Sequence, residues 1–238
     1  MERKMAENSM EKDLRYLYST CFRDLFFETR ATRMLSLLSP LVSGWSYLPM
    51  TNWSAGPEYY AHICNDLIIN KKESVIEAGS GISTILMARL IKKNNLKTKI
   101  ISIDHDPIWQ NVIAHCLETD GIAENVQFIC SPLAQQGEYS WYDKSKIVLP
   151  ENFVTDTIVI DGPIGNVPMA RYEAIPFLKK YLSSECYTIY LHDTDRPDEQ
   201  ETIRRWLEIL PNSAVQTMWR YSVIQFGTAF WFAPQTVA

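Results

Sequence analysis

Four segments carry residues able to bind a ligand, and each follows a short apolar run. They are the glycine-rich segment Glu77-Ala-Gly-Ser-Gly81 and the single acids Asp104, Asp161 and Asp193. In an open parallel sheet, ligands bind in the crevice beyond the carboxyl ends of the strands. The sequence therefore predicts four strand ends that share one ligand site.

The glycine pair Gly79 and Gly81 suits a tight turn that lets backbone amides approach a ligand just before a helix begins. A dinucleotide-binding fingerprint would place a third glycine where Thr84 stands, so a nicotinamide cofactor is disfavoured. Asp104 ends the next strand, where a carboxylate can accept hydrogen bonds from both hydroxyls of a ribose. The turn and the acid together are more specific than either alone.

The later acids are compatible with two mechanisms. Oxygen ligands from Asp161, Asp193 and Asp195 would suit Mg²⁺, which would lower the pKa of an acceptor hydroxyl. Without a metal, His192 or Asp193 would remove the proton of the acceptor as a general base. Because side chains alternate along a strand, we expect His192 and Asp193 on opposite faces of the sheet, which favours a structural role for His192.

Candidate residues of the acceptor site follow the strand that ends at Asp161. We expect the loop 162–170 to border the acceptor as an ordered lid, followed by Arg171 and Tyr172. Arg171 would bind an acidic acceptor group bidentately or pair with a nearby acid. Several aromatic residues would either wall the pocket or anchor loops to the core; they are Trp45, Tyr47, Trp53, Tyr59, Trp141 and Tyr142.

Strand and helix patterns alternate along most of the chain. We expect helices over residues 14–38, 57–70, 83–91, 109–119, 174–182 and 199–210, and strands over 74–77, 99–104, 126–130, 156–161 and 187–192. Two further strand-like runs, 214–221 and 223–232, are joined closely. The predicted fold is α/β: a Rossmann-like, seven-stranded, mostly parallel sheet with helices on both faces, a C-terminal antiparallel hairpin and an N-terminal helical extension.

With these motifs the chain resembles the class I S-adenosylmethionine-dependent methyltransferases over residues 57–232. More narrowly, it is similar to a poorly characterised bacterial branch of small-molecule methyltransferases, through the segments 103–106, 160–163, 170–172 and 192–196. The metal arrangement looks like that of catechol O-methyltransferase, but that family carries an Asp-Asn pair where this chain has Asp193-Thr194.

The resemblance implies that the stretch 75–84 cradles S-adenosylmethionine. On that interpretation, Gly79 and Gly81 flank the methionine moiety, Glu77 lies near its ammonium group and Asp104 holds the ribose. His105 and Ser131 would lie beside the adenine. The other cofactor-binding residues that we expect are Ser80, Ser83, Thr84 and Asp161.

Composition narrows the class of protein. The chain has 238 residues, a formal charge of −5 and five scattered cysteines, and it contains no long lysine or arginine block. We therefore expect a cytoplasmic protein with no nucleic-acid partner and, because no long apolar run is present, no membrane association. We expect two parts: an N-terminal extension or cap over residues 1–56 and a cofactor-binding domain over residues 57–238. The sequence does not decide whether the chain forms a homodimer.

The leading hypothesis is an enzyme that methylates a hydroxyl of a small molecule or sugar. Trp53, Arg171 and Tyr172 are its candidate acceptor-binding residues. An N-methyltransferase and a non-catalytic nucleotide-binding module are the alternatives, since a fold does not fix its function. An oxidoreductase is disfavoured by the missing third glycine and by the C-terminal hairpin.

Overall fold

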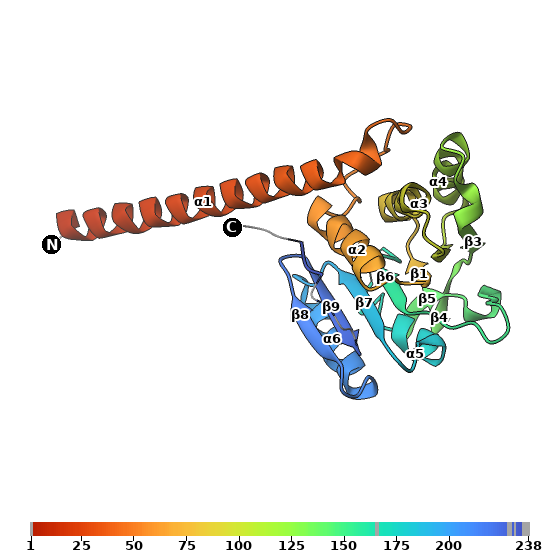
Figure 1. Cartoon of the computed structure of the whole chain (residues 1–238). Coiled ribbons are helices and arrows are strands. Elements are labelled where there is room, and N and C mark those ends of the chain that lie inside the picture. Colours follow the sequence, from red (N-terminus) through yellow and green to blue (C-terminus); the bar gives the residue numbers. More distant parts are fainter. Residues whose placement is uncertain (1, 165–166, 228–229, 231, 235–238) are drawn as a thin grey trace.

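A seven-stranded sheet forms the centre of the computed structural model, which describes residues 2–164, 167–227, 230 and 232–234 (Figure 1). The strand order is β3-β2-β1-β6-β7-β9-β8. The strands are β1 (Ser74–Ala78), β2 (Lys99–Asp104), β3 (Val126–Cys130), β6 (Thr157–Ile160), β7 (Tyr187–His192), β8 (Ala214–Thr217) and β9 (Tyr221–Phe226).

The first five of these strands pair in parallel, whereas β9 runs antiparallel to both β7 and β8. The predicted mostly parallel sheet with a C-terminal antiparallel hairpin is confirmed. The last predicted strand, 223–232, begins earlier, at Tyr221, and ends at Phe226; its residues 228–229 and 231 lie outside the described residues.

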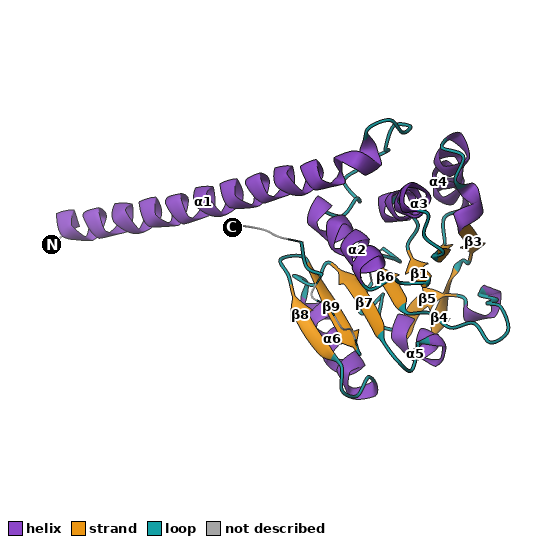
Figure 2. Cartoon of the chain, in the orientation of Figure 1, coloured by secondary structure: helices purple, strands orange, loops and turns teal. Residues whose placement is uncertain are grey.

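Helices cover both faces of the sheet (Figure 2). On one face lie α2 (Pro57–Ile69), α3 (Ile82–Asn94) and α4 (Pro107–Thr119), and on the other lie α5 (Ala174–Leu178) and α6 (Pro197–Ile209). Proline opens α2, α4 and α6 at the position where its missing N–H costs nothing. At the carboxyl ends of the parallel strands a cavity remains, which α2, α3 and α4 border through Tyr60, Ser83 and Trp109.

Alternation along the strands explains the two cores. Val75 packs into the cluster under α2 and α3, while its neighbour Ile76 packs into the cluster under α5 and α6. Both side chains are fully buried, as expected for a parallel strand that is covered on both faces. The same alternation holds at Val159 and Ile160 of β6.

A second, two-stranded sheet was not predicted. It consists of β4 (Leu133–Gln136) and β5 (Tyr139–Tyr142), which turn at Gly137 with a φ of 65°. These strands have four residues each, Leu-Ala-Gln-Gln and Tyr-Ser-Trp-Tyr, and show no regular apolar alternation. The 3₁₀ helices η1 (Ala123–Asn125), η2 (Lys144–Lys146) and η3 (Lys179–Tyr181) complete the elements, and η3 takes up the end of the predicted helix 174–182.

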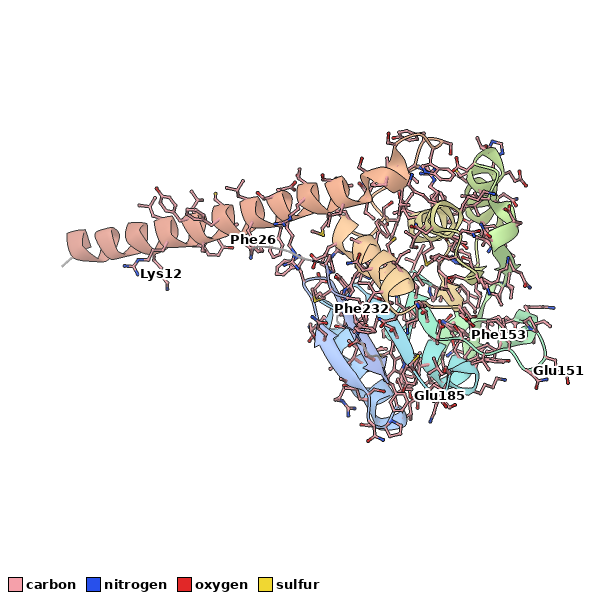
Figure 3. The ribbon with its side chains drawn as sticks, in the orientation of Figure 1. Lys12, Phe26, Glu151, Phe153, Glu185 and Phe232 are labelled. Carbon is pink, nitrogen blue, oxygen red and sulfur yellow. The ribbon has the colours of Figure 1, made fainter. Side chains whose placement is uncertain are left out.

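The N-terminal helix α1 (Glu2–Val42) is longer than the predicted 14–38 and projects away from the body (Figure 1). Of the α1 side chains that the structure describes, those buried in the core belong to its last turns: Met34, Leu38 and Leu41. Lys12 and Phe26 lie on the projecting part (Figure 3). Over the described residues, none of the helices, α1 included, has the length and apolar character of a membrane span.

Candidate active site

One cavity of about 360 Å³ lies where β1, β2, β6 and β7 end. This volume is within the range of about 300–1,000 Å³ that small-molecule sites occupy. Ten of the expected site residues line it: Trp53, Gly79, Ser80, Gly81, Ser83, Asp104, His105, Asp161, Arg171 and Asp193. Six others do not line it: Glu77, Thr84, Ser131, Tyr172, His192 and Asp195. The four predicted strand ends therefore do share one site.

The two glycines of the turn are required for different reasons. Gly79 has a φ of +100°, and a Cβ there would lie 2.7 Å from the backbone nitrogen of Gly162. The fold itself therefore requires glycine at this position, because β1 and β6 approach closely. Gly81 has a φ of −176°, and a Cβ there would meet nothing within 4 Å. Since Gly81 lines the cavity, its small size leaves room for a ligand.

Glu77 lies beneath the turn and is fully buried. Its carboxylate accepts hydrogen bonds from Ser83 Oγ and Ser102 Oγ, each at 2.6 Å, and from Thr84 Oγ1. Burial raises the pKa of Glu77 to about 7, although these hydroxyl groups oppose the shift. In the structure Glu77 therefore fixes the first turn of α3, and a contact with the ammonium group of a cofactor stays a prediction.

Asp104 is held at the end of β2 by two backbone amides. Its Oδ2 accepts from the Ser80 amide at 2.8 Å, and its Oδ1 accepts from the Asp106 amide at 2.9 Å. The next residue, His105, also lines the cavity, and its buried Nδ1 lies 3.3 Å from Asp104 Oδ1 without forming a hydrogen bond. Ser131, expected beside the adenine, is fully buried and donates to the Asp143 carbonyl at 3.0 Å instead.

The acids at the ends of β6 and β7 lie around His192. The Nδ1 atom of His192 is 3.1 Å from Asp161 Oδ1 and 3.3 Å from Asp193 Oδ1. The expectation that His192 and Asp193 lie on opposite faces is wrong, because β7 ends at His192 and Asp193 has a φ of 59°. Because Asp193 has a left-handed backbone conformation, its side chain lies beside that of His192 instead of on the opposite face of the sheet.

A buried arginine bridges the two carboxylates. Arg171 Nη2 lies 3.1 Å from Asp193 Oδ2 and 3.4 Å from Asp161 Oδ1, and its Nη1 donates to the His192 carbonyl at 2.9 Å. With Nε donating to the Pro163 carbonyl at 3.3 Å, every nitrogen of this guanidinium already has a protein acceptor. Arg171 therefore holds the strand ends together and pairs with nearby acids, one of the two expected alternatives; a contact with an acceptor stays a prediction.

The expected magnesium site does not fit these contacts. One atom each from Asp161, His192 and Asp193 lie within 4.8 Å of one another. However, the Arg171 guanidinium contacts both carboxylates, and Arg196 and Arg220 lie 3.0 and 2.7 Å from Asp193. A divalent cation would face these positive charges at close range. The expected third ligand, Asp195, is half-exposed and pairs with Arg220 at 3.8 Å.

The charges around His192 and Asp193 determine whether either side chain can act as a general base. Burial lowers the pKa of His192, but the Asp161 and Asp193 carboxylates outweigh this effect and raise it to about 9. Burial likewise opposes ionisation of Asp193, yet His192 and Arg171 hold its pKa well below the usual range. At neutral pH His192 is already protonated and Asp193 is a weak base. Asp161 is the remaining acid of the cluster; it lines the cavity and its side chain is 21% exposed.

The acceptor side differs from expectation in several residues. Tyr172 lies outside the cavity and packs edge-on against Tyr139, whereas Trp53 lines the cavity and is 74% exposed. Pro163 and Ile164 of the expected lid line it as well, and residues 165–166 of that lid lie outside the described residues. Gly162 of the same loop and Arg196 line the cavity too, as do Tyr60 and Trp109, for which no site role was predicted.

Comparison with known proteins supports the fold. No family model matches the sequence, and no curated protein matches it significantly. The solved O-methyltransferase TomG from Streptomyces achromogenes, in complex with S-adenosylmethionine, is 16% identical, with a TM-score of 0.51 over 74% of this chain and 82% of that one. The chain has the fold of the class I S-adenosylmethionine-dependent methyltransferases.

Two further methyltransferase structures share this fold. Precorrin-6y C5,15-methyltransferase from Geobacter metallireducens is 15% identical, with a TM-score of 0.53 over 79% of this chain and 99% of that one. The METTL16 methyltransferase domain is 16% identical, with a TM-score of 0.55 over 84% and 79%. The first of these proteins is named for a precorrin acceptor, and the name of the second gives no acceptor. The shared fold therefore does not indicate an acceptor for this chain.

Proposed function

We propose that the chain is an S-adenosylmethionine-dependent methyltransferase that methylates an oxygen of a small molecule or sugar without a bound metal. The observation that carries this proposal is the shared cavity at the ends of β1 and β2. Two of the residues that line this space support the proposal. One is Gly81, where neither the backbone nor the neighbouring atoms require glycine, and the other is Asp104, whose carboxylate accepts hydrogen bonds from two backbone amides.

The residues fit such a cofactor on chemical grounds. The turn 79–81 leads into α3, so the positive end of a 13-residue helix borders the cavity, which Ile82 and Ser83 of its first turn line. Asp104 is placed to accept from ribose hydroxyls, and His105, whose Nδ1 lies 3.3 Å from Asp104 Oδ1, lines the same space. When bound, S-adenosylmethionine would supply an electrophilic methyl group.

Asp161 is the residue we assign to the acceptor hydroxyl. It lines the cavity at the end of β6, and His192 at 3.1 Å and Arg171 at 3.4 Å hold its carboxylate in one orientation. In this role Asp161 accepts the proton that the hydroxyl loses as it is methylated. His192 and Arg171 act as positioning residues, because neither has a free site for the proton.

The experiment is S-adenosylhomocysteine release from S-adenosylmethionine, followed by mass spectrometry with a panel of sugar, phenol and amine acceptors. We expect O-methylated products and a loss of at least about 100-fold in turnover for Asp161→Asn, with S-adenosylhomocysteine binding retained. N-methylated products alone would select the nitrogen alternative. Cofactor binding without turnover on any acceptor would favour the non-catalytic module.

A further inference from the structure

Arg196 lines the cavity and has no part in the cofactor site described above. It follows the residues at the end of β7 and directly precedes α6. Its side chain is 43% exposed, and its Nη2 lies 3.0 Å from Asp193 Oδ2. The other arginine on the cavity wall, Arg171, is 3% exposed and donates to protein acceptors through all its nitrogens. Arg196 is therefore the guanidinium that a ligand in the cavity can reach.

Asp193 does not depend on Arg196 for its charge partner. Arg171 and Arg220 also contact it, at 3.1 and 2.7 Å. In the part of the chain that the structure describes, the Arg196 side chain makes this one ion pair, through Nη2. An arginine carries five N–H donors, so most of the donors of Arg196 are available.

The charged side chains that line the cavity differ between its two ends. Asp104 and Asp106 line it at the end of β2, where Asp104 accepts from backbone amides and Asp106 caps α4 through the amides of Ile108 and Trp109. At the end of β7, Asp193 is matched by more than one guanidinium. Between the ends of β2 and β7, the β7 end is therefore the one whose side chains favour an anion.

We propose that the methyl acceptor is a small molecule with a carboxylate group, and that Arg196 binds this carboxylate on the cavity wall. This inference rests on the proposed methyltransferase function and names the class of its substrate. The planar fork of a guanidinium matches a carboxylate through two parallel hydrogen bonds. A single available guanidinium balances a monoanion better than a doubly charged phosphate. The bound carboxylate orients the acceptor, and a separate hydroxyl is methylated.

The test measures binding of benzoate and of benzyl alcohol, an uncharged analogue with the same ring, to the full-length protein loaded with S-adenosylhomocysteine. We expect benzoate to bind more tightly, and Arg196→Gln to weaken benzoate binding by about tenfold or more. Arg220→Gln is the matched control, because Arg220 also pairs with Asp193 and is 47% exposed but does not line the cavity. It should leave benzoate affinity within about twofold of the wild type.

Binding of S-adenosylhomocysteine to each variant reports whether the cavity is folded, and Arg196→Lys, which keeps the charge but not the fork, should bind benzoate with intermediate affinity. The proposal is overturned if benzyl alcohol binds as well as benzoate, if the Gln variants at 196 and 220 behave alike, or if benzoate does not bind at about 10 mM. A wild-type protein that fails to bind S-adenosylhomocysteine would instead refute the proposed function.

Discussion

Replacing each glycine of the turn by alanine separates what the fold requires from what a ligand requires. At Gly79 the φ of +100° is strained for any side chain, and the added Cβ would lie 2.7 Å from the Gly162 nitrogen. Left-handed strain costs about 1–3 kcal/mol, and overpacking costs a similar amount. Gly79→Ala should therefore lose about 2–6 kcal/mol of unfolding free energy.

At Gly81 neither cost applies, because its backbone is extended and nothing lies within 4 Å of a Cβ. Gly81→Ala should keep its unfolding free energy within about 1 kcal/mol of the wild type. Its methyl group would face the cavity, so we expect affinity for S-adenosylhomocysteine to fall by about tenfold or more, or about 1.4 kcal/mol. Urea denaturation and calorimetric titration measure the two effects. A Gly81→Ala protein with wild-type affinity would refute this reasoning.

Two further predictions concern the cluster around His192. The pKa of His192 rises from 6.5 to about 9 on folding, so its charge stabilises the fold below pH 6.5 and this contribution is lost as the pH rises through 9. At about 1.4 kcal/mol per pH unit, wild-type stability should fall by roughly 3 kcal/mol more than that of His192→Gln over this interval, measured by urea denaturation; parallel curves would contradict it. Turnover should be unchanged by EDTA, because Arg171 contacts the carboxylates that Mg²⁺ would need; loss of activity restored by Mg²⁺ would show the metal assignment to be right.

The strands of the parallel sheet were predictable from sequence, because burial on both faces produces continuous apolar runs. The predicted bounds 99–104, 126–130 and 187–192 are those of β2, β3 and β7. The hairpin of β4 and β5 was not predictable in the same way. Its buried residues Trp141 and Tyr142 adjoin exposed or half-buried polar neighbours, so no apolar alternation identifies a strand.

The positions of the candidate site residues were predictable where the place along a strand decides, and were not predictable where tertiary contacts decide. Asp104 and Asp161 line the cavity because strand ends of a parallel sheet meet at one edge. The contact between His192 and Asp193 depended on the φ of Asp193, and the role of Arg171 depended on which carboxylates surround it. The need for glycine at 162 arises from the approach of β1 to β6, which a single sequence does not reveal.

The central claim is that the cavity at the ends of β1 and β2 binds S-adenosylmethionine. The most direct measurement is a calorimetric titration of the full-length protein with S-adenosylhomocysteine and, separately, with NADH. We expect S-adenosylhomocysteine to bind at one site per chain, Asp104→Ala to weaken that binding, and NADH to show no binding. Binding of NADH without binding of S-adenosylhomocysteine would contradict the account.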